Sequence, residues 1–141
     1  MGKSPNNHNN LGVLYQLLGD PQSSKRHFEI FRKELEKRVR ASPEKGDNYL
    51  VLGLVLTRLG EKERSWEMGQ KAMELDPDQH FLYARLLSVQ GKTQEAIDQL
   101  ELAIQDGFRN YIEMKINDDL QLLHNEPGFK ELLDRGLKQE I

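Results

Sequence analysis

A nine-residue segment that ends in glycine occurs three times in this chain. It reads LGVLYQLLG at residues 11–19, LGLVLTRLG at residues 52–60 and, more loosely, YARLLSVQG at residues 83–91. The closing glycines lie 41 and 31 residues apart. A polar turn and a second apolar pattern of helical spacing follow each copy. Repetition over tens of residues is typical of chains built from stacked units, so the sequence predicts a helix, a glycine turn and a second helix, three times over.

Glycine has two different roles in this repeat. The closing residues Gly19, Gly60 and Gly91 stand where a helix ends in the left-handed conformation, which glycine adopts at little cost. Gly12 and Gly53 instead lie inside the first helix, where glycine costs about 1 kcal/mol relative to alanine. We expect these two positions to let a neighbouring helix approach closely.

The second helix of each pair is predicted from apolar residues spaced by three and four. The first of these helices should run over about residues 21–40, and the first helix of the third pair over residues 78–90. The predicted buried stripes are Phe28, Phe31, Leu35 and Val39; Trp66, Gly69 and Met73; and Ala96, Ile97, Leu100, Ala103 and Ile104.

These residues resemble the tetratricopeptide repeat, whose pattern is W-x2-L-G-x2-Y, then A-x3-F and a final Pro. The second copy matches best, with Tyr49, Leu52, Gly53, Ala72 and Pro77. The resemblance implies an all-α superhelix of three repeats, at residues 8–45, 46–76 and 77–107, after leader residues 1–7. Gly69 stands where the family prefers a bulky aromatic residue, a space that we expect Trp66 to fill.

The tail, residues 108–141, is predicted to form helices that cap the last repeat. Asn117 should cap a short helix with Leu120, Leu122 and Leu123 on its apolar side, and Pro127 should begin another. The tail resembles the segment that closes the repeat region of bacterial multidomain signalling proteins. That likeness implies a C-terminal part of a larger bacterial protein. It is carried by Gly107, Phe108, Asp119, Leu120, Leu123, Pro127, Phe129, Leu132 and Leu133.

The composition indicates in which cellular compartment the chain is expected. The 141 residues include no cysteine and no apolar run near the ~20 residues that span a bilayer, so we expect a cytoplasmic protein that does not bind membranes. The formal net charge of −3 is unevenly distributed. Residues 1–71 carry 13 Lys and Arg against 9 Asp and Glu, net +4, whereas residues 72–141 carry 7 against 14, net −7.

Catalytic and metal-binding motifs are not evident. His8, His27, His80 and His124 do not stand at metal-ligand spacing, and His8 and His80 occupy equivalent repeat positions, which favours packing. Aspartate pairs such as Asp118 and Asp119 stand at predicted helix starts, where they serve as caps. We therefore expect that the chain is not an enzyme and that it binds no cofactor and no metal.

The basic segment SKRHFEIFRKELEKRVR raises the possibility of phosphate contacts. However, Glu29 with Lys33, Glu34 with Arg38 and Glu36 with Arg40 have the i,i+4 spacing of ion pairs on a solvated helix. The pattern favours a solvated helix over nucleic-acid binding.

The remaining hypothesis is a protein-binding groove. In the family that the chain resembles, the first helix of each repeat lines a concave surface, and the resemblance implies a protein or peptide partner there. Chaperone-binding members hold a terminal carboxylate with Lys and Asn, but the corresponding positions here are Asn9, Val13 and Leu54, so that clamp is missing. The alternative is a homodimer formed through the helix at residues 21–40. The predicted groove residues are Asn9, Val13, Gln16, Leu50, Leu54, Thr57, Arg58, Phe81, Arg85 and Ser88.

Overall fold

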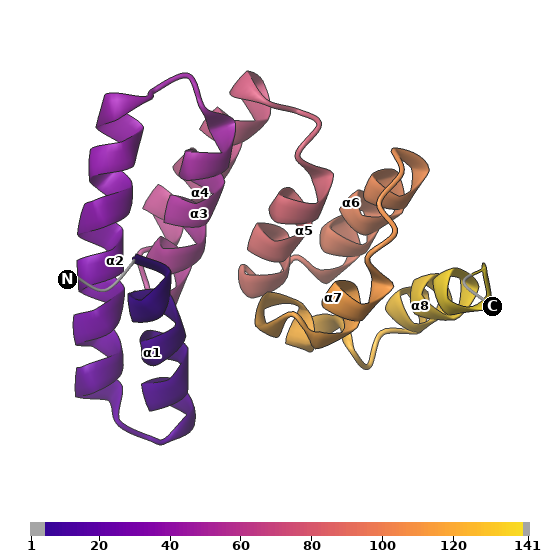
Figure 1. Ribbon diagram of the computed structural model, residues 1–141, viewed down its shortest axis with the longest axis horizontal. Helices are drawn as coiled ribbons and strands as arrows, with labels where there is room; N and C mark the ends of the chain where they lie inside the picture. Colours follow the sequence, from indigo (N-terminus) through magenta and orange to yellow (C-terminus); the bar gives the residue numbers. More distant parts are fainter. Residues whose placement is uncertain (1–4, 140–141) are drawn as a thin grey trace. The chain divides into compact units, whose positions relative to one another are not determined.

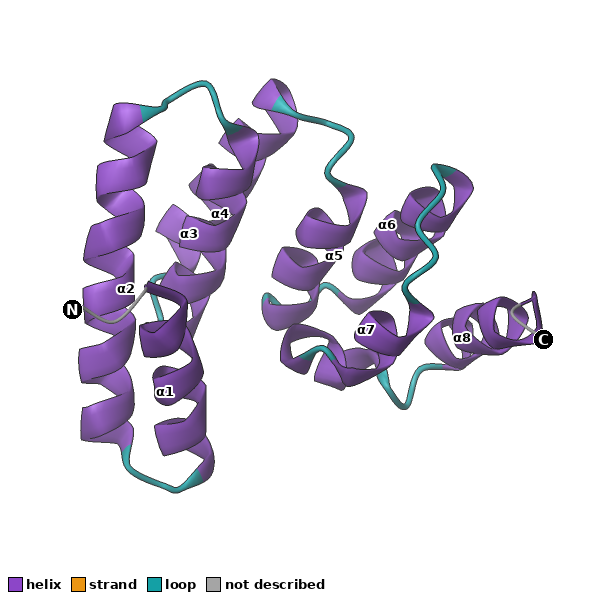
Figure 2. Ribbon diagram, viewed as in Figure 1, coloured by secondary structure: helices purple, strands orange, loops and turns teal. Residues whose placement is uncertain are grey.

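The computed structural model describes residues 5–139, which form helices and turns and, within that range, no strand (Figures 1 and 2). The all-α class predicted from the sequence is confirmed. The chain divides into two compact units, Met1–Asp76 and Pro77–Ile141, and the division falls where the second predicted repeat ends. Within residues 5–139, no helix combines the length and the apolar character needed to cross a membrane.

Unit 1 contains four helices, α1 (Pro5–Leu17), α2 (Pro21–Ala41), α3 (Gly46–Arg58) and α4 (Lys62–Leu75). Helix α1 packs against α2, α2 against α3, and α3 against α4. The predicted second helix, residues 21–40, is confirmed to within one residue. Helix α1 begins inside the predicted leader, and residues 1–4 lie outside the described residues.

The core of unit 1 confirms the stripe predicted for α2 and only part of the one predicted for α4, where Gly69 is buried and Met73 half-buried as expected of that stripe but Trp66 is not. Phe28, Phe31 and Leu35 are buried, and Val39 packs beside them. On α4, the buried residues are Ser65, Gly69 and Ala72, while Trp66 is 41% exposed. The expectation that Trp66 fills the space beside Gly69 was therefore wrong. Small residues let α3 and α4 pack closely, and the large indole lies towards solvent.

The closing glycines adopt the conformation that the sequence predicts. Gly19, Gly60 and Gly91 have φ angles of 77°, 82° and 81°. At the end of α1, the amide of Asp20 donates to the carbonyl oxygen of Tyr15 and that of Gly19 to Gln16, at 2.9 and 3.2 Å. This is the Schellman arrangement, and it recurs at Gly60, Gly91 and Gly107. The same backbone device therefore ends the first helix of each pair and also α6 (Thr93–Gln105).

The glycines inside the first helices lie at close helix contacts. A Cβ atom on Gly12 would lie 2.5 Å from Cε1 of Phe28, so only glycine fits this position. The hydroxyl of Ser24 donates to the carbonyl oxygen of Gly12 at 2.7 Å, and Ser65 donates to Gly53 at 2.8 Å. Both serines lie twelve residues after their glycine, so the first two helix pairs share one internal hydrogen bond. In the third pair, alanines occupy both positions, Ala84 and Ala96, and both are buried.

Unit 2 contains α5 (His80–Val89), α6, α7 (Tyr111–Ile116), the 3-10 helix η1 (Asp118–Leu123) and α8 (Pro127–Gln139). Helix α5 is three residues shorter than the predicted 78–90. Asn117 caps η1 by accepting a hydrogen bond from the Asp119 amide at 2.9 Å, as predicted. Helix α7 was not predicted, and Leu122 is 63% exposed rather than on the apolar side of η1.

The tail completes the core of unit 2. Leu120, Leu123, Phe129 and Leu132 from the tail are buried in one cluster with residues of α5 and α6. Helix α5 packs against α6 and η1, and α7 packs against α8. The members contributed by α5, α6 and α7 are Ala84, Leu87, Ala96, Ile97, Leu100, Tyr111 and Met114.

Candidate functional site

The predicted groove residues of α1 are accessible to different degrees. Asn9 and Val13 are half-buried, and Val13 packs against the core of unit 1. Gln16 is exposed. Of these three side chains, Gln16 offers the most surface for a contact.

The predicted groove residues of α3 serve mostly in packing. Leu50 and Leu54 are buried, at 0% and 5% exposure. The Thr57 hydroxyl lies 2.9 Å from the carbonyl oxygen of Gly53 and 2.6 Å from the Ser65 hydroxyl, inside the helix contact. Arg58 lies over the ring of Phe28, with its guanidinium carbon 5.8 Å from the ring centroid.

The predicted groove residues of α5 also have partners or are buried. Phe81 stacks on Phe108, with ring centroids 4.4 Å apart. Arg85 pairs with the buried carboxylate of Asp119 through Nε at 2.9 Å and Nη2 at 2.8 Å. Ser88 is 1% exposed. Arg85 therefore fixes η1 to α5, and its charge is already compensated within the unit.

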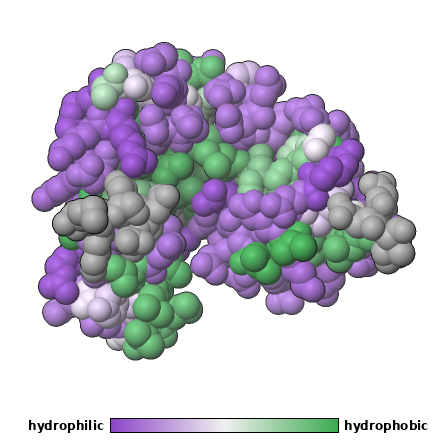
Figure 3. Space-filling view, viewed as in Figure 1, coloured by the Kyte–Doolittle hydropathy of each residue, from purple (hydrophilic) through white to green (hydrophobic). Residues whose placement is uncertain are grey.

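An apolar stripe on α1 was not among the predicted site residues. Leu14, Leu17 and Leu18 are 47%, 80% and 68% exposed. Leu17 and Leu18 follow Leu14 by three and four residues, so the three side chains lie on one face at the end of α1, with Leu18 directly after its last residue. Figure 3 shows the corresponding hydrophobic surface over the end of α1. We call these three residues the leucine stripe.

The basic surface of α2 carries different ion pairs from the predicted ones. Arg32 pairs with Glu29 and, at 3.1 Å, with Glu36. The hydrogen bond from Arg32 to Glu29 raises the pKa of the guanidinium. Lys37 pairs with Glu34 at 3.3 Å, three rather than four residues away. The apolar face of α2 is packed within unit 1, and Phe31 is 3% exposed.

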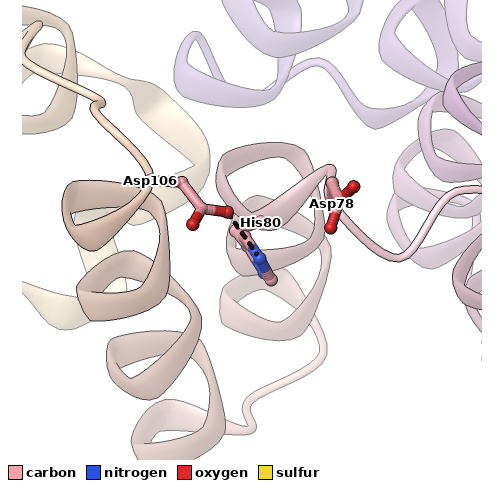
Figure 4. Close-up of side chains that lie close together, drawn as sticks. All are labelled: Asp78, His80 and Asp106. Carbon is pink, nitrogen blue, oxygen red and sulfur yellow. Dashed lines mark ion pairs between the residues drawn. The ribbon is translucent and has the colours of Figure 1, made fainter.

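A second candidate site lies in unit 2, at the start of α5 and the end of α6. Asp78, His80 and Asp106 each present a ligand atom, and these atoms lie within 4.8 Å of one another (Figure 4). Nε2 of His80 is 3.2 Å from Oδ2 of Asp106. Spacing along the sequence did not reveal this cluster because Asp106 is 26 residues from His80. The sequence feature that points to this cluster is Asp78-x-His80, at the start of a predicted helix.

The imidazole of His80 is held by a second contact. Its Nδ1 lies 2.8 Å from Oε1 of Gln99, nineteen residues later on α6. The corresponding residues of the first helix pair, His8 and His27, also meet, with their Nδ1 atoms 3.0 Å apart. His80 and His8 therefore hold equivalent positions in their helix pairs, as expected if His80 serves in packing. In addition, the contact with Gln99 leaves Nε2 of His80 facing Asp106.

A cavity of about 280 Å³ opens at this cluster. The stacked rings of Phe81 and Phe108 form an apolar side, and the three polar residues form the other. Asp78 and Asp106 are exposed, whereas the His80 side chain is only 14% exposed. The arrangement can offer one nitrogen and two carboxylate groups to a ligand that enters from solvent.

Comparison with known proteins does not assign the chain to a family. The sequence matches no protein-family model and no curated protein sequence. Its function is therefore inferred from its own residues.

Proposed function

We propose that this chain is a tetratricopeptide-like scaffold module of a larger bacterial cytoplasmic signalling protein, and that it binds a protein segment. The observation that carries the proposal is the leucine stripe of α1. Large apolar side chains grouped on one face of a helix usually mark an interaction surface, because their exposure to water is unfavourable. Exposed polar residues around such a surface can form the polar rim of a contact.

Three features support this interpretation. The first two helix pairs repeat the same serine-to-glycine hydrogen bond, and all three pairs repeat the same glycine turn. Gln16, a predicted groove residue, precedes Leu17 directly and is exposed. No catalytic motif is evident in the sequence. Together these features favour recognition over catalysis.

The charge of unit 1 indicates what kind of segment would bind. Residues 1–76 carry 13 Lys and Arg against 11 Asp and Glu, net +2, and Lys25 and Arg26 are exposed on α2, which packs against α1. A segment with leucine-like anchors and flanking acidic residues would complement both the stripe and this charge. The buried predicted residues Leu50 and Leu54 would then pack inside unit 1 rather than contact the partner, and Ser88 is buried in unit 2.

Selection from a random peptide library displayed on phage, with the whole chain as target, tests the proposal. We expect enriched peptides to combine apolar and acidic residues. Their affinity, measured by fluorescence anisotropy, should fall at least about tenfold with Leu14→Glu and Leu17→Glu together, a loss of about 1.4 kcal/mol. The matched control is Ile112→Glu with Ile116→Glu, two exposed isoleucines of unit 2.

Two results would contradict the proposal. One is a library that yields no saturable binder, or binders that respond equally to both pairs of substitutions. The other is a dimer in light scattering that becomes a monomer with the Leu14 and Leu17 substitutions. That second result would show that the stripe joins two copies of the chain, which is the alternative raised by the sequence.

A further inference from the structure

We propose that Asp78, His80 and Asp106 form a binding site for a divalent transition metal of the zinc class. The site lies wholly within unit 2 and does not depend on the leucine stripe. The residues come from the turn before α5, the first residue of α5 and the C-cap of α6. Close packing of α5 against α6 therefore brings the three ligands together.

The distance between the two nearest ligand atoms fits a shared ion. Zinc lies about 2.0–2.2 Å from nitrogen and oxygen ligands in a tetrahedral arrangement, which places two ligands about 3.4 Å apart. Nε2 of His80 and Oδ2 of Asp106 are 3.2 Å apart. A carboxylate oxygen of Asp78, on an exposed turn, lies within 4.8 Å of both other ligand atoms and is the third ligand that we propose.

The contact with Gln99 prepares His80 to bind a metal. When Oε1 of Gln99 accepts this hydrogen bond, Nδ1 of His80 is the donor and carries the proton. In the neutral imidazole, Nε2 then holds the lone pair, and that lone pair faces the Asp106 carboxylate. A lone pair and a carboxylate repel each other unless a proton or a cation lies between them. Fixing a histidine through its other nitrogen is a regular feature of metal sites.

The ligand set selects the class of ion. One imidazole nitrogen with two carboxylates suits zinc and its neighbours in the first transition series, whereas magnesium and calcium prefer oxygen ligands alone. Three protein ligands leave a position for water or for an incoming ligand. The cavity beside Phe81 and Phe108 gives access to that position. Unit 2, residues 77–141, carries 7 Lys and Arg against 12 Asp and Glu, and this net charge of −5 further favours a cation here.

Isothermal titration calorimetry of the chelator-treated whole chain with zinc chloride tests the site. We expect saturable binding of one zinc ion per chain, with no competition from millimolar magnesium. Asp106→Asn and His80→Gln should each weaken binding by at least about tenfold. Asp98→Asn is the matched control, since Asp98 is an exposed aspartate on the same helix, α6, outside the cluster. It should leave the affinity unchanged.

A spectroscopic measurement connects binding to the assigned nitrogen. Zinc should shift the Nε2 resonance of the His80 imidazole in nitrogen-detected NMR, with Nδ1 still protonated. Absence of binding at millimolar zinc would overturn the proposal. So would equal affinity in wild type and the Asp106→Asn variant, or binding that is lost with His27→Asn but retained with His80→Gln, because the His8–His27 contact would then be the site.

Discussion

The ring of Phe28 occupies the space that a Cβ atom of Gly12 would need, with only 2.5 Å between that atom and Cε1 of the ring. Phe28 is 1% exposed and lies in the core of unit 1, so it has little room to move. The same glycine accepts the Ser24 hydrogen bond at its carbonyl oxygen. This contact sets how closely α1 and α2 approach each other.

Gly12→Ala should therefore destabilise unit 1. We expect a loss of about 1–3 kcal/mol, because the added methyl group forces apart well-packed helices. Urea denaturation followed by far-ultraviolet circular dichroism measures this loss and also the effect of a control in unit 2, because both units are helical. The control is Gly128→Ala, where the nearest atom, Cγ2 of Ile97, is 3.5 Å away and the methyl group fits. Equal losses for the two variants would contradict the close-contact explanation.

The pair of Arg85 and Asp119 should stabilise unit 2 more than an exposed ion pair does. The Asp119 side chain is 7% exposed, so Arg85→Met would leave a buried carboxylate without its arginine. We expect a loss of about 2–3 kcal/mol, somewhat below the range for fully buried pairs because Arg85 is 23% exposed.

Arg135→Met is the matched comparison for that experiment. Arg135 pairs with Glu101 at 3.4 Å, and both side chains are about half exposed. Its loss should be below about 1 kcal/mol, because water already screens the pair. Denaturation followed by far-ultraviolet circular dichroism measures both variants. A larger effect for Arg135 than for Arg85 would show that burial does not control the strength of these pairs.

Two serine-to-alanine substitutions should have opposite effects. Ser88 is 1% exposed, and its hydroxyl has no hydrogen-bond partner among the described residues. Ser88→Ala should stabilise the chain by up to about 1 kcal/mol, since it removes a buried unsatisfied group and improves helix propensity. Ser65→Ala should cost about 1 kcal/mol, because it removes the hydrogen bond to Gly53. Thermal denaturation of both variants gives the two signs.

Asp20, the N-cap of α2, should make the stability of unit 1 sensitive to acid. Hydrogen bonds from the Ser23 hydroxyl, at 2.7 Å, and then from the Ser23 amide, at 3.1 Å, lower the pKa of its carboxyl group below the ordinary 3.8. Because the pKa is lower in the folded chain, this stabilisation is fully present above the unfolded pKa. It is lost as the pH falls through the folded pKa.

Carbon-detected NMR of the Asp20 carboxyl group measures this shift directly. Ser23→Ala removes the largest cause, so the pKa of Asp20 should rise towards 3.8. Asp20→Asn keeps a capping side chain that does not titrate, and this variant should lose less stability on acidification than the wild type. A pKa that does not respond to Ser23→Ala would exclude the hydroxyl as its cause.

The sequence placed several candidate site residues on a helix face, but it did not show whether their side chains are exposed to solvent. Leu50, Leu54 and Ser88 stand at positions that the sequence resemblance predicts to line a groove, yet all three are buried. Leu17 stands one position from the predicted Gln16 and is 80% exposed. Position on a helix fixes the direction of a side chain, whereas its exposure depends on which neighbour covers that direction.

The sequence by itself determined the helices, their glycine turns and most of the buried stripes, because these depend on interactions among residues close together along the chain. Left-handed glycine and apolar spacing by three and four act within one or two helical turns. Only the tertiary structure decided that His80 meets Asp106, that Arg85 pairs with Asp119 and that Trp66 is exposed. Those contacts depend on the distance between two packed helices and on the rotation of each helix about its axis. Both quantities are determined by packing among side chains that are far apart along the chain.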